Sequence, residues 1–191
     1  MHVRDYTKGP PTILANNHPI RHGSVVGIHN GIIENDDAIF TRYRLRRAEP
    51  EMTVDSEAIF ALMEATGNDH RALEALGGAL ATAWIDERDD ATMYVARGVA
   101  RPLWLGRGRH ELFFASTKAA LDVVSQALRI PLTRTELGEG RFLHVRAGQT
   151  VAVHRFRPDR SYRERNALPA VRAPHERASC LARLAVIAAA A

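Results

Sequence analysis

The sequence has 191 residues, of which 46% are apolar and 25% charged, a composition that excludes a disordered chain and fits one folded domain with a short appendage. No apolar run reaches the roughly 18 residues of a membrane span, and the first residues lack the layout of a secretory signal, so we expect no membrane partner. The formal charge is +4, but residues 155–191 hold eight arginines and three acidic residues, which leaves the rest of the chain close to neutral. Because nucleic-acid-binding motifs are also absent, we expect no nucleic-acid partner.

The N-terminal part of the chain predicts a loop followed by two short strands. Residues 1–23 are rich in His, Pro, Asn and Gly, which is typical of loops. Short apolar runs at 24–28 and 32–33 predict strands. Asn30-Gly31 lies between the two runs and predicts a tight turn, because both residue types tolerate positive φ.

Helical patterns come next. Residues 38–47 have helical character on a polar background. The stretch Thr53-Val54-Asp55-Ser56-Glu57 then supplies N-cap residue types and an early acid, which predicts a helix with Ile59, Leu62 and Met63 at helical spacing. A further short helix is expected over 70–76, where Gly77-Gly78 ends it.

The second half of the chain changes to a strand pattern. Paired strand-like runs lie at 79–85 and 92–96, at 102–105 and 112–115, and at 141–145 and 150–156. One helix interrupts them, Lys118–Leu128, with an inward face of Ala119, Ala120, Val123, Val124 and Leu128. Early helices followed by antiparallel hairpins predict an α+β fold. Residues 157–191 form a basic tail rich in Arg, Pro and Ala, whose end, 179–191, could form a terminal helix.

Asn30-Gly31 has two interpretations. A hairpin turn alone would explain the dipeptide. Alternatively, the Asn30 amide and the Gly31 backbone N–H could form an oxyanion hole, in which two donors converge on a developing negative oxygen.

Three stretches carry a resemblance to a known family. They are Asn16-Asn17-His18-Pro19, His29-Asn30-Gly31-Ile32-Ile33-Glu34-Asn35 and Thr53-Val54-Asp55-Ser56-Glu57. At this spacing they resemble the glutaminase domain of class II glutamine amidotransferases, which are N-terminal-nucleophile hydrolases, and most closely that of the glucosamine-6-phosphate synthases. The resemblance covers about residues 2–156, which we interpret as a partial domain 1–156 with the tail 157–191. It implies a four-layer αββα sandwich that is truncated at its N-terminus.

The resemblance also implies roles for individual residues. Asn30 and Gly31 would form the oxyanion hole, and Asp55 would bind the α-amino group of glutamine. Arg4, helped by Thr7, would pair with the substrate carboxylate. Two plainer interpretations remain open, in which Asp55 is only a helix N-cap and Arg4 only a surface charge.

The chain also departs from the family pattern. Asp5-Tyr6 replaces Trp-Ala, and Lys8 replaces a histidine, although a lysine could serve an anion. His18, His22 and His29 could suggest a metal site, but no carboxylate-flanked helical motif supports one, so we expect no metal and no organic cofactor.

The family nucleophile is a cysteine at the mature N-terminus, whose α-amino group acts as the general base. We expect that the segment that bears it is absent here, and the single cysteine, Cys180, lies in the tail without an adjacent α-amino group. One cysteine also excludes an intramolecular disulfide, so we expect a reducing, cytoplasmic location.

We therefore expect a glutamine amidotransferase domain that hydrolyses glutamine to glutamate and ammonia for an acceptor such as a sugar phosphate. Its expected partners are glutamine and either an acceptor domain or a second copy of the chain. Two other hypotheses are a non-catalytic glutamine-binding or regulatory domain and a degenerate interaction protein.

Overall fold

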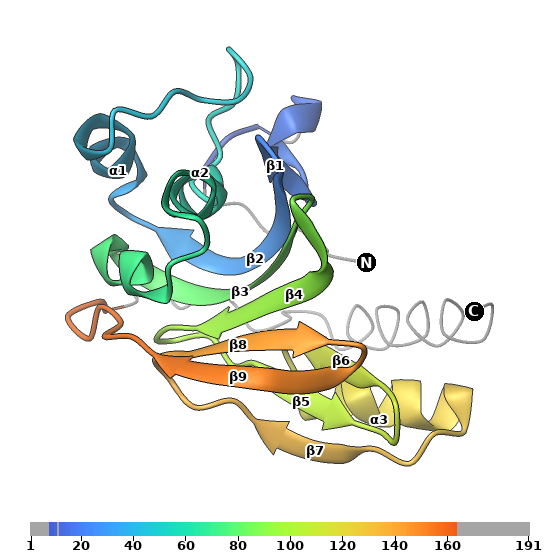
Figure 1. The fold of residues 1–191 in the computed structure, drawn as a ribbon. Coiled ribbons are helices and arrows are strands. Elements are labelled where there is room, and N and C mark those ends of the chain that lie inside the picture. The colour runs from blue at the N-terminus through green and yellow to red at the C-terminus, as the bar shows by residue number, and fades with distance from the viewer. Residues whose placement is uncertain (1–7, 11, 164–191) are drawn as a thin grey trace.

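The computed structural model describes residues 8–10 and 12–163, which form two antiparallel sheets with helices packed on them (Figure 1). The large sheet has the strand order β1-β2-β3-β4-β8-β9, with β1 at Ile20–His22, β2 at Val25–Ile33, β3 at Gly78–Asp86, β4 at Asp89–Arg97, β8 at Arg141–Arg146 and β9 at Gln149–Arg155. The small sheet has the order β6-β5-β7, with β5 at Trp104–Arg107, β6 at Leu112–Ala115 and β7 at Thr133–Glu136. The helices are the 3₁₀ helix η1 (Leu14–Asn16), α1 (Asp36–Arg42), α2 (Glu57–Thr66), the 3₁₀ helix η2 (His70–Ala75) and α3 (Lys118–Leu128).

One face of the large sheet is covered by α1, α2 and η2 (Figure 1). Every residue of α2 from Glu57 to Met63 is buried. The ring of Phe60 packs directly on the strand β2, because Gly27 there has no side chain; a Cβ at Gly27 would lie 2.3 Å from Phe60 Cε1. Farther across this face, Trp84 and Tyr94 stack with their ring centroids 5.5 Å apart. Apolar burial against the sheet thus fixes the position of α2 and of the turn that precedes it.

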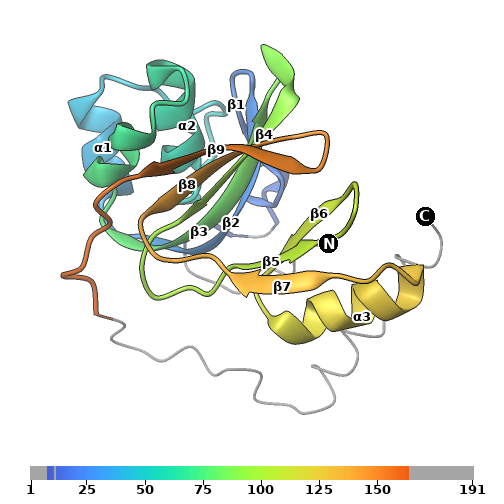
Figure 2. The same ribbon diagram turned by 60° about the horizontal axis from the view of Figure 1, so that its bottom comes forward.

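The small sheet packs on the opposite face. Ala81, Val95 and Leu143 of the large sheet share one buried cluster with Leu103 and Leu105. The next residue along β5, Gly106, faces the other way, since an added Cβ there would lie 3.1 Å from Leu121 of α3. Figure 2 accordingly shows α3 on the side of β5 and β7 that is away from the large sheet.

The predicted α+β fold with antiparallel hairpins is confirmed. The helix predicted over 118–128 has these bounds, although its deepest residues are Ala120 and Leu121 rather than the wider face we expected. The helix predicted over 38–47 ends earlier, at Arg42, and residues 1–23, predicted as loop, contain η1 and β1. Among the described residues, no helix has the length and apolar character needed to cross a membrane.

The tight turn predicted at Asn30-Gly31 is wrong, because both residues lie inside the continuous strand β2. They pair with Ala81 and Leu80 of β3 in unbroken register. Gly31 has a φ of 151°, and a Cβ there would lie 2.0 Å from the carbonyl oxygen of Ala79. The glycine therefore allows the neighbouring backbone to approach closely and does not reverse the chain.

Candidate functional site

The central feature of the site is one edge of strand β2. Strand β1 pairs with β2 only as far as Gly27, so the following residues of β2 extend beyond it. There, the backbone N–H of His29 donates to His18 Nε2 at 3.1 Å, and that of Ile33 donates to Asp55 Oδ2 at 2.7 Å. Because N–H directions alternate along a strand, the N–H of Gly31 points to the same edge, between the other two. We call these three N–H groups the β2 edge.

Asn30 lies beside the β2 edge with its side chain on a face of the sheet. It is directly opposite Ala81, which belongs to the core between the two sheets, so the Asn30 amide lies on the face toward the small sheet. It is half-buried. Asn30 and Gly31 are thus adjacent and present a side-chain amide and a backbone N–H, which are the two donor types of an oxyanion hole.

Asp55 is held at one end of the β2 edge, on the turn before α2. Only 1% of it is exposed, and burial raises the pKa of its carboxyl group against the lowering effect of the Ile33 hydrogen bond. Helix α2 begins at Glu57 with no side-chain cap from Ser56, and the Asp55 carboxylate accepts from β2, a bond that an N-cap role alone does not require. Gly31 N and Ile33 N are separated by two strand residues, roughly 7 Å, a length that an extended glutamine side chain can span.

Two side chains fix the turn that carries Asp55. The buried amide of Asn16 accepts from the N–H groups of Thr53 at 2.9 Å and Val54 at 3.1 Å. On the other side, His29 Nε2 lies 3.1 Å from the carbonyl oxygen of Ala79, and His29 Nδ1 lies 2.9 Å from Ser56 Oγ. Since a carbonyl only accepts, Nε2 carries the proton and Nδ1 accepts from the Ser56 hydroxyl. The turn is therefore connected to both η1 and β2.

An ion cluster of Lys8, Asp36, Asp37, Arg47 and Glu57 supports the same region, and two of its carboxylates, Asp36 and Glu57, are buried. Arg47 lies 2.7 Å from Asp36 and 3.1 Å from Glu57, whose side chain is fully buried. Lys8 Nζ lies 2.6 Å from Asp36 and 3.1 Å from Asp37. Burial would lower the pKa of Lys8, but these two carboxylates outweigh it and raise the pKa. Lys8 thus forms ion pairs with the two carboxylates at the start of α1.

The other predicted site residues have different outcomes. Arg4 and Thr7 lie outside the described residues, as does Cys180. The His18 ring accepts from the backbone N–H of His29, the His29 ring contacts Ser56, and His22 lies 2.9 Å from Glu57. The described residues contain no group of three or more side chains suited to hold a metal. The absence of a metal or cofactor stays a prediction.

The sequence reasoning singled out Gly31 and Asp55 but assigned no role to Asn16 or Arg47. Asn16 belongs to the motif Asn16-Asn17-His18-Pro19, which is the signal that could have identified it. Arg47 lies in a polar stretch without a motif, and only the structure shows that it joins Asp36 to Glu57.

Comparisons with known proteins show which family the chain resembles. A family model described as "Glutamine amidotransferase domain" matches residues 12–123. The glutamine–fructose-6-phosphate aminotransferase of Aliivibrio fischeri is 34% identical over 128 residues, which cover 63% of this chain and 21% of that protein. The Salmonella typhi enzyme of the same name is 32% identical over 162 residues, which cover 81% of this chain and 24% of the relative. The chain therefore spans a fifth to a quarter of these relatives' length.

The structure of the glutamine phosphoribosylpyrophosphate amidotransferase from B. subtilis, complexed with ADP and GMP, has a similar fold. The match has a TM-score of 0.63 at 23% identity and covers 81% of this chain and 34% of that chain. At this level of identity the likeness concerns the fold alone.

Proposed function

This chain belongs to the class II glutamine amidotransferase domain family, and we propose that it binds L-glutamine and stabilises the transition state for hydrolysis of the side-chain amide to glutamate and ammonia. The observation that carries the proposal is the β2 edge. A single strand places the Gly31 N–H between two N–H groups that already have side-chain partners, and it places the Asp55 carboxylate at one end. In the proposal, the side-chain amide of glutamine binds at the Gly31 N–H and its α-amino group binds at the Asp55 carboxylate.

Each group has a physical reason for its role. Attack on the amide carbon puts negative charge on the amide oxygen, which the Asn30 amide and the Gly31 N–H would stabilise, each donor being worth roughly 10²–10³ in rate. An ammonium group beside Asp55 would offset the burial that raises the pKa of this carboxyl group. Arg4, helped by Thr7, remains our proposal for the substrate carboxylate.

The chemistry also requires a nucleophile with its own base. In this proposal it is an N-terminal cysteine thiolate with its α-amino group, supplied from outside the 191 residues, because Cys180 has no adjacent α-amino group. We further propose that the complete domain is a four-layer αββα sandwich. The ammonia would pass to an acceptor domain or subunit, with a sugar phosphate as the acceptor, by analogy with the relatives' names.

Calorimetric titration of the full chain with L-glutamine tests the binding step. We expect saturable binding that Asp55→Asn weakens at least about tenfold, because a charge-assisted contact is lost. Glutaramic acid, which has the amide and the carboxylate of glutamine without the α-amino group, is the matched ligand and should bind equally weakly to both proteins. If Asp55→Asn leaves glutamine affinity unchanged, the assignment of Asp55 is wrong.

The intact mass of the protein from its native source tests the catalytic step. A mass well above 21.2 kDa with an N-terminal cysteine, together with ammonia release from glutamine, would support the glutaminase. A mass of 21.2 kDa with glutamine binding and no ammonia release would instead support the non-catalytic glutamine-binding domain, the second candidate that the lone Cys180 favours.

A further inference from the structure

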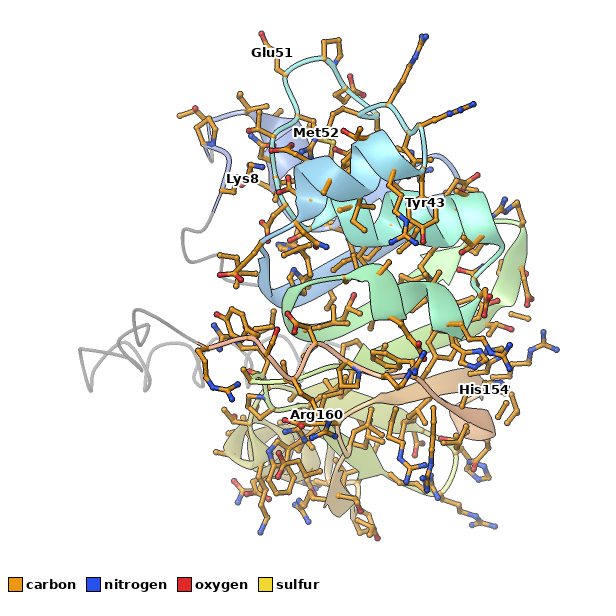
Figure 3. The ribbon with its side chains drawn as sticks, turned by 90° about the vertical axis from the view of Figure 1, so that its left-hand side faces the viewer. Lys8, Tyr43, Glu51, Met52, His154 and Arg160 are labelled. Carbon is orange, nitrogen blue, oxygen red and sulfur yellow. The ribbon has the colours of Figure 1, made fainter. Side chains whose placement is uncertain are left out.

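A groove of about 830 Å³ lies where β8 begins and β9 ends, beside η2. Five of its lining residues are arginines: Arg71, Arg141, Arg155, Arg157 and Arg160. We call it the arginine groove. Figure 3 shows Arg160 and His154 in the lower part of the molecule, away from Lys8 and Met52. Arg160 of the arginine groove therefore lies away from Lys8 of the ion cluster.

The two carboxylates that line the groove already have partners. Glu74 accepts three hydrogen bonds from Arg157, from its backbone N–H at 3.0 Å, Nε at 3.0 Å and Nη2 at 2.9 Å. Glu139 lies 3.7 Å from Arg160. Within the described part of the chain, Arg71, Arg141 and Arg155 form no ion pair with a carboxylate. Five guanidinium groups and two carboxylates leave an excess of positive charge.

Two of these arginines face each other directly. Arg141 of β8 is the register partner of Arg155 of β9, so their side chains project from the same face of the sheet. Like charges directly opposite each other destabilise a sheet. An anion placed between them would convert this repulsion into two attractive contacts.

The third arginine is held close by an aromatic contact. His70 of η2 stacks on His154 of β9 with the ring centroids 4.6 Å apart. Each histidine is the chain neighbour of a groove arginine, Arg71 and Arg155 respectively. The stack therefore keeps the backbone of η2 beside the end of β9 and brings Arg71 to the groove before any ligand binds.

We propose that the arginine groove binds the phosphate group of a small molecule. Guanidinium groups are planar donors that match phosphate oxygens in pairs, and two of them here, Arg141 and Arg155, form no ion pair with a carboxylate of the described residues. The volume is in the range of small-molecule sites, so it can hold an ester as well as free phosphate. Arg141 also lies three strands from Asn30 in one cross-strand row, roughly 14 Å away. The phosphate would thus bind at the same end of the sheet as the β2 edge, and its binding does not depend on glutamine hydrolysis.

Titration of the full chain with inorganic phosphate, and separately with glucose 6-phosphate, tests the proposal. We expect saturable binding of at least one probe, weakened tenfold or more, roughly, in Arg141→Gln/Arg155→Gln, since two charge-assisted contacts are lost. The matched control is Arg46→Gln/Arg109→Gln, which removes the same charge from exposed positions outside the groove and should leave the affinity unchanged. Tighter binding of glucose 6-phosphate would identify an ester site, and tighter binding of inorganic phosphate a site for the free anion.

Two results would overturn the proposal: no saturable binding of either probe, or an equal loss of affinity in the control variant. Unfolding cannot imitate the expected result, because removing the like-charged pair should leave the melting temperature of the ligand-free protein unchanged or higher. A thermal melt of each variant checks this point.

Discussion

The ion cluster beside α2 and the arginine groove at the end of β9 contain the same residue types in opposite arrangements. In the ion cluster, Arg47 contacts Asp36 and Glu57, and each of these carboxylates has a further partner. In the arginine groove, Arg141 faces Arg155 and both lack a carboxylate partner among the described residues. The contrast teaches that charges with a structural role are neutralised inside the protein, whereas charges that serve a ligand are left for the ligand to neutralise.

Breaking the ion cluster should give the largest effect. Arg47→Met would leave Glu57, which is fully buried, without its guanidinium partner, and such a loss costs about 3–5 kcal/mol in the free energy of unfolding. Urea denaturation measures it. The control is Arg21→Met, which breaks an exposed pair with Glu87 and should cost far less, because solvent screens this pair. Equal losses would show that the ion cluster is not a structural element.

The second prediction concerns the β2 edge itself. Gly31→Ala would place a Cβ 2.0 Å from the Ala79 carbonyl oxygen and should cost about 3 kcal/mol, because backbone must move. Gly67→Ala is the control, since Gly67 also has a positive φ, 63°, but no atom within 4 Å of an added Cβ. It should cost only about 1–2 kcal/mol, the conformational penalty alone. Guanidinium denaturation of both variants separates the cost of the steric clash at Gly31 from the cost of a positive φ alone.

The smallest effect is expected at Asp55, and it depends on pH. Burial raises the pKa of Asp55 in the folded protein above its ordinary value of 3.8. As pH rises above that value, the unfolded chain ionises first, so this group lowers the free energy of unfolding until the folded carboxyl also ionises. Asp55→Asn keeps an acceptor for the Ile33 N–H, so the variant should gain stability relative to the native protein as pH rises above about 4.

Glu87→Gln provides the opposite sign. The hydrogen bonds from Arg21 lower the pKa of Glu87, so its stabilisation is present at neutral pH and is lost on acidification. Unfolding free energies across the same pH range should therefore diverge in opposite directions for the two variants. If the two variants show the same dependence of the unfolding free energy on pH, the ionised Asp55 carboxylate does not destabilise the fold.

Elements that depend on local pattern could be predicted from the sequence. Helices α2 and α3 have apolar residues at helical spacing, and the β3–β4 and β8–β9 hairpins alternate around polar turns. Strand β7 could not be predicted, because Thr133–Glu136 is polar and becomes a strand only by pairing with β5. The turn expected at Asn30-Gly31 failed for a related reason, since a register of nine residues with β3 overrides the preference of a dipeptide.

The residues of the site also divide into those that a local motif identifies and those that only contacts between distant segments reveal. Gly31 and Asp55 stand in motifs that suggest their chemistry. The contacts of Asn16 with Thr53 and Val54 join positions 37 and 38 residues apart in the chain. Both segments stand in motifs, but the sequence does not show that the two motifs touch. Whether the Arg4 and Thr7 assignments are right stays a prediction.

The clearance at Gly31 has a consequence for how substitutions in this domain are interpreted. Only a hydrogen atom fits beside the Ala79 carbonyl, so selection for the sheet alone would forbid every other residue type at this position, even in a chain that had stopped binding glutamine. Asp55 has no such restriction, because an asparagine could still accept the Ile33 N–H. In a mutational survey, tolerance at position 31 would therefore report on folding, whereas tolerance at position 55 would report on whether a substrate is still being recognised.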